Sequence, residues 1–426
     1  MKNRIFIIGG GASGMAAAFW AARAGADVTI LEHMDRVGKK LLSTGNGRCN
    51  LTNGYMACHC FRSDEPDFPM KVIEQFGFED TIEWFSGMGL EVKDRQGYYY
   101  PASDQASAVL DVLRMSLKEL GVKVICGFSV TSVKKTNQEK WQITGMHKDK
   151  SGSAEKESLY GDCVILAAGS KAAPSTGSDG SGYELAKALG HRIIRPLPAL
   201  VQLRCQGNYY KHLAGVRTDA LLTLYAGEKE EAKERGELQL TDYGLSGIPA
   251  FQISRYASKA LEAKRRVVVK IDFFPDRTAE ETRRFLDQRR KRFPERACED
   301  FLTGLLNKKL SMVLLKLSDI CLTEPCRSIT RGQMDHLCRQ LKEYQALVQS
   351  VNPFPNAQVC CGGVDTREMN PKTLESRIQK DLYIIGELLD VDGICGGYNL
   401  QWAWATGCLA GTAAARADTV KKEIRR

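Results

Sequence analysis

The pattern of apolar and polar residues opens with a short run that contains no polar side chain. Residues 5–8 read Ile-Phe-Ile-Ile, which is typical of a parallel β-strand buried on both faces. Residues 9–14 are glycine-rich, and the alanine-rich residues 15–24 favour an α-helix that ends at Gly25. Residues 28–31 form a second apolar run, which ends at Glu32. This order predicts the strand–helix–strand unit of a parallel sheet.

The glycine-rich turn has the spacing G-x-G-x-x-G, and each of its glycines has a mechanical role. Gly9 permits the tight turn, Gly11 lets the backbone approach a pyrophosphate, and Gly14 lets the helix pack close to its strand. Between them, Ala12 and Ser13 open a helix whose N–H groups are available to phosphate oxygens. The turn therefore predicts a dinucleotide site.

An acidic residue and a polar loop follow the second strand. Glu32 is placed to accept hydrogen bonds from a ribose hydroxyl, which favours FAD or NAD over NADP but leaves those two open. Residues 39–53 form either a solvated loop or backbone wrapped around a phosphate-bearing cofactor. Because glycines permit close approach and basic side chains neutralise charge, we expect the second, through Lys39, Lys40, Gly45, Gly47 and Arg48.

Further apolar runs predict more strands of the same domain. They lie at residues 122–125, 129–133, 163–169 and 381–387. A glycine-rich segment at residues 389–401 then opens a last helix, which we expect over residues 402–417. Because these features return late in the chain, residues 1–194 and 355–426 are expected to form one cofactor-binding domain.

The intervening chain has a different character and is expected to be an insertion. Residues 203–240 alternate in strand-like runs, which predicts an antiparallel β layer over residues 195–249 and 317–354. Residues 250–316 are rich in paired charges and are expected to form a helical subdomain. The basic run Arg289–Arg292 is interpreted either as a solvated helix face or as a docking surface for a polyanion.

Composition narrows the class of protein only moderately. A hydrophobic content of 43% and a charged content of 26% are ordinary for a globular protein. No run of eighteen apolar residues occurs, and the N-terminus lacks the layout of a signal peptide, so we expect neither a membrane span nor export. Fourteen scattered cysteines in a chain of this length favour the reducing cytoplasm. The net charge of +9 permits an acidic or nucleic-acid partner without requiring one.

Longer motifs extend over almost the whole chain. They read G-G-G-A-S-G-M at residues 9–15, G-K-K-L-L-x-x-G-x-G-R-C-N-x-T-N at residues 38–53, P-S-T-G-S-D-G-S-G-Y at residues 174–183, L-S-G at residues 245–247 and C-G-G-V at residues 361–364, and they continue through residues 386–403. Together they resemble the BaiN-like FAD-dependent oxidoreductases, a family also labelled aminoacetone-oxidase-like or the YhiN/RdsA group.

The resemblance implies an α/β fold and names further cofactor residues. The fold would be a Rossmann-type FAD-binding domain, of the two-dinucleotide-binding flavoprotein kind, that carries the inserted β layer and helical subdomain. The bound cofactor would be FAD. The additional residues that the resemblance places at the cofactor are His33, Cys49, Asn50, Val130, Ala168, Gly169, Gly386, Glu387, Asp392, Gly393, Gly396, Gly397, Tyr398 and Asn399.

Reduction of a C=C or C=N bond with a flavin needs a proton donor beside the hydride donor. Cys395 and Cys49 lie in motifs expected near FAD, although a free cysteine is more often a small buried apolar residue. The aromatic residues 98–100 are expected either to stack on flavin or substrate or to pack within a strand. No metal site is expected at Cys58-His59-Cys60, because a second ligand pair at zinc spacing is lacking. Asp242 departs from the family pattern, in which many members have His.

The resemblance implies two kinds of substrate, a uridine of large-subunit (23S) ribosomal RNA reduced to dihydrouridine, and the steroid ring system of bile acids. The net charge and the run Arg289–Arg292 favour RNA, because phosphates attract clustered cations. If NAD(P)H is the reductant, it would bind transiently through an atypical site, since no second dinucleotide motif is visible; the alternative is another electron donor. The alternatives are a steroid reductase, a flavin amine oxidase that uses O₂, and a non-enzymatic FAD-bearing RNA-binding assembly factor. The oligomeric state is not predicted.

Overall fold

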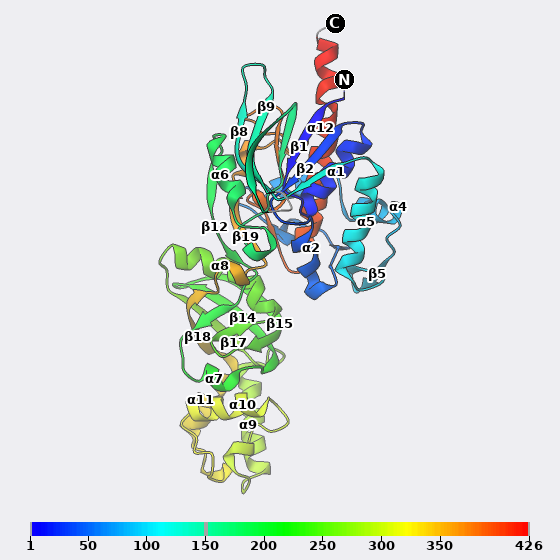
Figure 1. Ribbon diagram of the computed structural model, residues 1–426. Coiled ribbons are helices and arrows are strands. Elements are labelled where there is room, and N and C mark those ends of the chain that lie inside the picture. The colour runs from blue at the N-terminus through cyan, green and yellow to red at the C-terminus, as the bar shows by residue number, and fades with distance from the viewer. Residues whose placement is uncertain (1, 149–151, 425–426) are drawn as a thin grey trace. The chain divides into compact units, whose positions relative to one another are not determined.

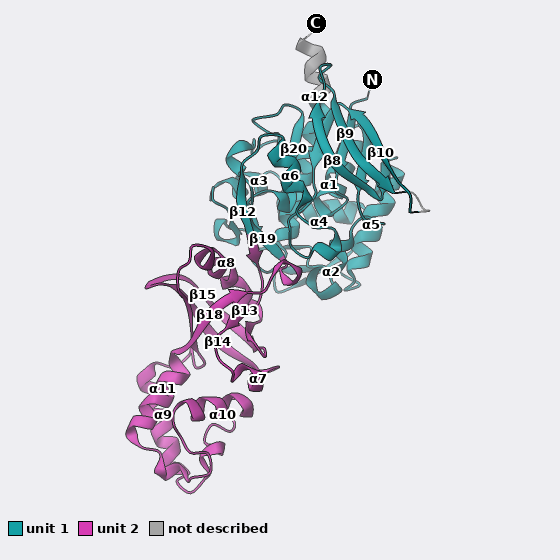
Figure 2. Cartoon of the chain, turned by 60° about the vertical axis from the view of Figure 1, so that its left-hand side comes forward, with its two compact units in different colours: residues 1–196, 359–426 teal, residues 197–358 magenta. Residues whose placement is uncertain are grey.

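The computed structural model describes residues 2–148 and 152–424. The chain forms two compact units, each with its own hydrophobic core (Figure 2). Unit 1 contains Met1–Pro196 and Val359–Arg426, and unit 2 contains Leu197–Gln358. Unit 1 is thus assembled from both ends of the chain.

A five-stranded parallel sheet forms the centre of unit 1 (Figure 1). Its order is β20-β11-β1-β2-β7, built from β1 (Arg4–Ile8), β2 (Asp27–Glu32), β7 (Lys123–Cys126), β11 (Cys163–Leu166) and β20 (Leu382–Ile384). The register pairs Ile8 with both Leu31 and Leu166, so the carboxyl ends of the three central strands lie together. The apolar run of β1 is buried, as expected for a strand that is covered on both faces.

Smaller sheets and helices surround this centre. A three-stranded antiparallel sheet contains β8 (Phe128–Lys135), β9 (Trp141–Lys148) and β10 (Ala154–Gly161), and another contains β3 (Thr52–Asn53), β6 (Tyr98–Pro101) and β5 (Val92–Arg95). Two pairs complete the strands, β4 (Phe61–Arg62) with β21 (Asp392–Gly393), and β12 (Ile193–Ala199) with β19 (Val359–Val364). The helices are α1 (Ala12–Arg23), α2 (Lys39–Ser43), α3 (Phe68–Ile73), α4 (Phe78–Gly87), α5 (Ala106–Glu119), α6 (Ser181–Ala188) and α12 (Tyr398–Ile424).

The first and last helices of unit 1 pack against each other more closely than ordinary side chains allow. Helices α1 and α12 lie beside each other (Figure 1), and Gly407 and Gly411 of α12 face α1. A Cβ atom at Gly407 would lie 2.7 Å from the carbonyl oxygen of Ser13, and one at Gly411 would overlap the carbonyl oxygen of Ala17. Small residues on both helices therefore make this approach possible, and it brings the end of the chain to the start.

Unit 2 contains a closed six-stranded antiparallel barrel. Its order is β13-β16-β15-β14-β17-β18, and β13 also pairs with β18, which closes the barrel. The strands are β13 (Leu203–Cys205), β14 (Arg217–Ala226), β15 (Lys229–Leu240), β16 (Gly244–Ser246), β17 (Val267–Asp272) and β18 (Tyr344–Val351). The helices are α7 (Tyr210–Leu213), α8 (Ile248–Glu262), α9 (Ala279–Arg292), α10 (Lys308–Leu317) and α11 (Arg331–Lys342).

The predicted fold class is confirmed, with a Rossmann-type domain, an antiparallel insertion and helices. Two details of the structure predicted from the sequence were wrong. Residues 250–316 do not form a purely helical subdomain, because β17 lies within them and pairs with β14 and β18. The last helix begins at Tyr398 and not at residue 402, because Tyr398 and its neighbours already form the first turn of α12.

We expect Gly411→Ala to destabilise the protein by about 2 kcal/mol, because the added methyl group must push α12 away from the backbone of α1. Urea unfolding followed by circular dichroism measures this change in the free energy of unfolding. Gly87→Ala in α4 is the matched control, since a Cβ atom there meets no atom within 4 Å. Equal stability of the two variants would show that the close packing of the helices contributes nothing.

Candidate functional site

The predicted cofactor residues come together at the carboxyl ends of the parallel strands. Gly9 follows β1, Glu32 ends β2, Ala168 lies two residues beyond β11, and Gly386 lies two residues beyond β20. In open α/β sheets, ligands bind at this edge. The fold therefore brings residues from both ends of the chain to the place where a dinucleotide is bound.

The glycine-rich turn provides a backbone cradle at the start of α1. A Cβ atom at Gly14 would overlap the carbonyl oxygen of Gly9, so the third glycine is required for the turn to pack. A Cβ atom at Gly11 would meet no atom within 4 Å, so this residue faces open space. The N-cap position of α1 has no side-chain cap, and its first turn has no acidic residue. Its N–H groups and helix dipole are therefore available to a phosphate group.

Glu32 is held by the backbone around it. Its Oε2 accepts a hydrogen bond from the Gly10 N–H and its Oε1 accepts one from the Met34 N–H, each at 2.8 Å. His33 Nδ1 lies 3.5 Å from Oε1. Each carboxylate oxygen has two lone pairs, so the fixed group keeps acceptor capacity for a ribose hydroxyl.

An ion pair joins the two ends of the chain at this edge. Lys40 Nζ donates to Glu387 Oε2 at 2.5 Å, and the Ser170 hydroxyl donates to the same oxygen at 3.1 Å. Both charged side chains are largely buried, so water screens their attraction less than it screens a surface pair. Ser170 was not predicted from the sequence. Its position directly after the small residues that end β11 was the available indication.

A second junction lies where α12 begins. Asn53 Nδ2 donates to the carbonyl oxygen of Gly396 at 3.0 Å, and the Thr52 hydroxyl donates to Gln401 Oε1 at 2.6 Å. A Cβ atom at Gly397 would lie 2.7 Å from the carbonyl oxygen of Thr52. Asn53 closes the motif at residues 38–53, and its role as a tether was missed because sequence spacing does not show partners that lie over 340 residues away.

Exposure divides the predicted cofactor residues into two groups. Those that keep accessible surface are Gly9, Gly11, Ala12, His33, Lys39, Lys40, Gly45, Gly47, Arg48, Asn50, Val130, Ala168, Gly169, Glu387, Gly396, Gly397 and Asn399. Those that the protein's own atoms bury are Ser13, Gly14, Glu32, Cys49, Gly386, Asp392, Gly393 and Tyr398. We infer that the first group provides the contact surface and that most of the second group supports it.

Cys49 does not fit either role predicted for it. The residue is 0% exposed, so it presents no surface to a cofactor or a substrate. Burial raises the pKa of its thiol to about 12, although a hydrogen bond with Thr44 acts in the opposite direction. The prediction of Cys49 as a proton donor or cofactor contact is therefore corrected to that of a packing residue.

Asp392 and Gly393 also support the contact surface of the site from within the protein. Asp392 is buried. The Asn399 side chain holds Gly393 on both sides, since its Oδ1 accepts from the Gly393 N–H at 2.8 Å and its Nδ2 donates to the Gly393 carbonyl at 3.0 Å.

Cys395 is half-buried just before Gly396, and its role as a proton donor stays a prediction. Asp242 is exposed and belongs to unit 2.

Two of the four basic residues in the run of unit 2 make internal hydrogen bonds, whereas Lys291 and Arg292 are exposed. Arg289 donates to the carbonyl oxygens of Phe301 at 2.5 Å and Thr303 at 2.7 Å, and Arg290 donates to the carbonyl of Ile329. The guanidinium of Arg292 lies over the ring of Phe293, 5.5 Å from its centroid. The arginines therefore hold the loops around α9, which neither interpretation of this run anticipated.

No group of three or more His, Cys, Asp or Glu side chains among residues 2–148 and 152–424 is arranged to hold a metal ion. In the same part of the chain, no helix is long and apolar enough to cross a membrane.

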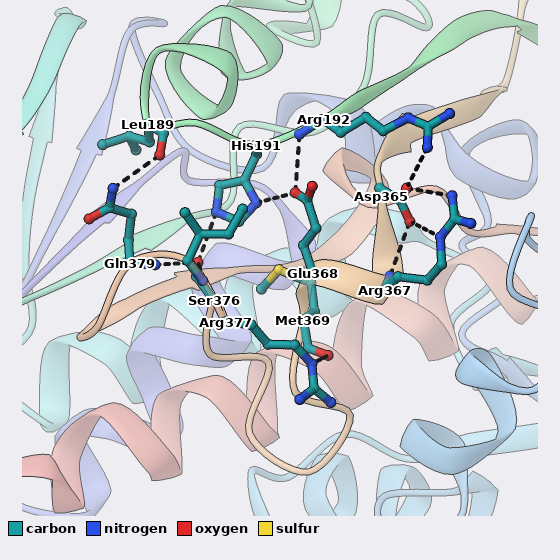
Figure 3. Close-up of polar contacts among 11 residues, drawn as sticks. Leu189, His191, Arg192, Asp365, Arg367, Glu368, Met369, Ser376, Arg377 and Gln379 are labelled. Atoms are coloured by element: carbon teal, nitrogen blue, oxygen red, sulfur yellow. Dashed lines mark hydrogen bonds and ion pairs between the residues drawn. The ribbon is translucent and has the colours of Figure 1, made fainter.

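A serine–histidine–glutamate chain elsewhere in unit 1 resembles a hydrolytic triad in its contacts only (Figure 3). His191 Nδ1 lies 2.8 Å from Glu368 Oε2, and Ser376 Oγ lies 2.9 Å from His191 Nε2. The Ser376 oxygen also accepts the N–H groups of Ile378 and Gln379, and both Ser376 and His191 are buried. These contacts secure the loop between β19 and β20, and they leave the hydroxyl oxygen unavailable as a nucleophile.

The donor set at the strand ends fits a dinucleotide with a flavin. The uncapped start of α1 and Gly11 suit a pyrophosphate, and Glu32 suits a ribose. The fold and site thus define a Rossmann-type flavoprotein. The chain belongs to the family described as HI0933-like protein Rossmann domain, whose model matches residues 3–413.

Two relatives and one solved structure illustrate the range of the similarity. The chain is 47% identical to a protein of Clostridium scindens named 3-dehydro-bile acid delta(4,6)-reductase, over 97% of this chain and 99% of that protein. It is 27% identical to a Haemophilus influenzae protein named ribosomal RNA dihydrouridine synthase, over 94% of this chain and 95% of that protein. A flavocytochrome c3 fumarate reductase structure aligns with a TM-score of 0.48 and 14% identity, over 97% of this chain and 78% of the other.

The resemblance to BaiN-like proteins is confirmed, and the protein is a flavin-dependent oxidoreductase. When bound, the flavin supplies hydride transfer, and the chain supplies binding and orientation. Lys40, Gly11, Glu32 and the start of α1 are the parts of this chain that would hold it.

We expect Glu32→Gln to weaken FAD binding about tenfold, a loss of about 1.4 kcal/mol. The amide keeps one acceptor oxygen, so either the Gly10 or the Met34 N–H faces an NH₂ group and the ribose loses an acceptor. Titration of FAD into cofactor-depleted protein gives the dissociation constant. Glu119→Gln, at the exposed end of α5, is the control and should bind FAD as the unaltered protein does. Unchanged FAD affinity in Glu32→Gln would remove this residue from the site.

The His191 contact predicts a loss of stability below pH ~6.5. Burial lowers the pKa of His191, although Glu368 acts in the opposite direction, so the unfolded chain takes up a proton before the folded one does. The free energy of unfolding therefore falls as the pH drops below the unfolded value, by at most ~1.4 kcal/mol per pH unit. His191→Gln removes this titration, so its stability deficit relative to the unaltered protein should shrink between pH 7 and pH 5 in urea unfolding. A stability deficit of His191→Gln that stays constant between pH 7 and pH 5 would contradict the predicted titration of His191.

Proposed function

We propose that the protein reduces a carbon–carbon double bond in a steroid of the bile-acid class, with bound FAD and with NAD(P)H as the source of electrons. The observation that supports this most is the 47% identity to the protein named 3-dehydro-bile acid delta(4,6)-reductase, which extends over nearly the full length of both chains. Identity at this level over 97% of the chain includes both units, so it covers the cofactor site and the insertion alike.

The residues near the cofactor site suit such a reaction. A double bond conjugated to a carbonyl accepts hydride at its far carbon, and negative charge then develops on the carbonyl oxygen, where a hydrogen-bond donor stabilises it. Cys395, half-buried beside Gly396, is retained as a proposed source of the proton. Water must be kept from the reacting atoms, and the buried residues around the start of α12 help to do so.

The sequence alone favoured uridine in ribosomal RNA, and that preference depended on charge. Much of the run Arg289–Arg292 is engaged with the carbonyl groups and a ring of unit 2, which weakens the argument. Reduction of a uridine in ribosomal RNA is the second proposal, because the relative at 27% identity supports it. Amine oxidation and a non-catalytic RNA-binding role have no such support.

The deciding experiment is anaerobic. We expect NADH or NADPH to bleach the flavin absorbance of the purified holoenzyme, and a 3-oxo-Δ4 bile acid to restore it, with a product that is two mass units heavier. Restoration by a uridine-containing fragment of 23S ribosomal RNA, and not by the steroid, would favour the second proposal. Bleaching by a primary amine without NAD(P)H would indicate an oxidase, and protein that takes up no FAD would reject all of these functions.

A further inference from the structure

Two large aromatic side chains are exposed on neighbouring segments of unit 1. Tyr55 is 58% exposed and Tyr98 is 43% exposed. Single exposed apolar residues are common on protein surfaces, but a pair at one place next to a cofactor site calls for a physical explanation.

The pairing of β3 with β6 brings the two residues onto neighbouring segments of the chain. Asn53 is opposite Tyr98 in this antiparallel pair, and the Gly54 N–H donates to the Gly97 carbonyl at 2.8 Å, so the pairing continues beyond β3. Tyr55 follows Gly54 directly, so its backbone leaves the pair beside the segment that carries Tyr98.

Asn53 fixes this pair against the turn that precedes α12. Its side chain is buried, its Oδ1 accepts from the Tyr55 N–H at 2.9 Å, and its Nδ2 donates to the Gly396 carbonyl at 3.0 Å. One buried amide thus ties the backbone of Tyr55 to a residue predicted to line the flavin.

Tyr98 reaches the same turn directly. A Cβ atom at Gly396 would lie 2.9 Å from Cε1 of Tyr98, so only a glycine allows this ring to lie where it does. The ring of His59 is 5.7 Å from that of Tyr55, which adds another side chain that can donate a hydrogen bond. Rings with polar tips therefore gather at the predicted flavin end of the site.

We propose that Tyr55 and Tyr98 form the substrate-binding surface of the enzyme, with their rings against the flat apolar face of a steroid and a hydroxyl donating to its ketone oxygen. This inference rests on the proposed function and specifies which residues recognise the substrate. An aromatic ring offers a large apolar area, and its hydroxyl supplies the hydrogen bond that a ketone needs.

The test uses the holoenzyme and 3-oxo-4-cholenoic acid, without reductant, so that binding is measured apart from turnover. Binding is followed by the change in the flavin absorption spectrum. We expect Tyr55→Ala and Tyr98→Ala each to raise the dissociation constant of the steroid about tenfold or more, through loss of the ring contact. Phenylalanine in place of either tyrosine keeps the ring, and the residue whose hydroxyl meets the ketone should show a rise of about three- to tenfold.

Tyr160→Ala is the matched control. Tyr160 is 50% exposed on β10, and its hydroxyl accepts from Gln142 Nε2 at 3.0 Å within the β9–β10 hairpin. This variant should bind the steroid with unchanged affinity. Visible absorbance confirms the FAD content of every variant, and the phenylalanine variants provide a comparison if an alanine variant fails to fold.

The outcomes separate the inference from the function on which it rests. Equal steroid affinity in all variants, with FAD bound, overturns the inference and leaves the reductase proposal intact. A holoenzyme whose flavin spectrum responds to a uridine oligonucleotide and not to the steroid overturns both. Selective weakening in the Tyr55 and Tyr98 variants, with Tyr160→Ala unaffected, supports the inference.

Discussion

The close contact between α1 and α12 is the constraint on which the cofactor site depends. Gly407 and Gly411 let the last helix rest on the backbone of the first, and the Trp402 indole N–H donates to the Gly386 carbonyl at 3.0 Å. The Gly386 N–H in turn donates to the Thr406 hydroxyl at 3.1 Å. Helix α12 therefore holds the turn after β20 directly, and that turn carries Glu387. This contact therefore helps to position the half of the predicted site that the last part of the chain supplies.

Polar contacts then connect the two ends of the chain at the site itself. Lys40 with Glu387 and Asn53 with Gly396 each join residues more than 340 positions apart. Such contacts cannot form before the insertion is complete, because the second partner has not yet been reached in the chain. The sheet accommodates the insertion because β20 pairs in parallel with β11, a strand that precedes it.

The sequence supported the fold and the cofactor class well, because their signals are local. The glycines at residues 9–14 and the acid at Glu32 act within one strand–helix–strand unit, so their spacing contains the information. The burial of Cys49 follows the general tendency of free cysteines, whereas the motif around it had suggested a cofactor contact. Strand β17 was missed for a different reason. Its short run Val267–Asp272 lies between charged helical segments, and only its partners β14 and β18 make it a strand.

The two substrate classes place different demands on the chain. RNA would require cations free to meet phosphates and would require a uridine to leave its stack. A steroid would require a flat apolar surface with one well-placed donor. In unit 2, Arg289 and Arg290 donate to the protein's own carbonyls, and in unit 1, Tyr55 and Tyr98 are exposed and the ring of Tyr98 lies beside Gly396. The net charge of +9 describes the whole chain, whereas recognition depends on the groups at the reacting end of the flavin. The groups that we propose there are Tyr55 and Tyr98, whose rings and hydroxyls suit a flat apolar molecule that carries a ketone.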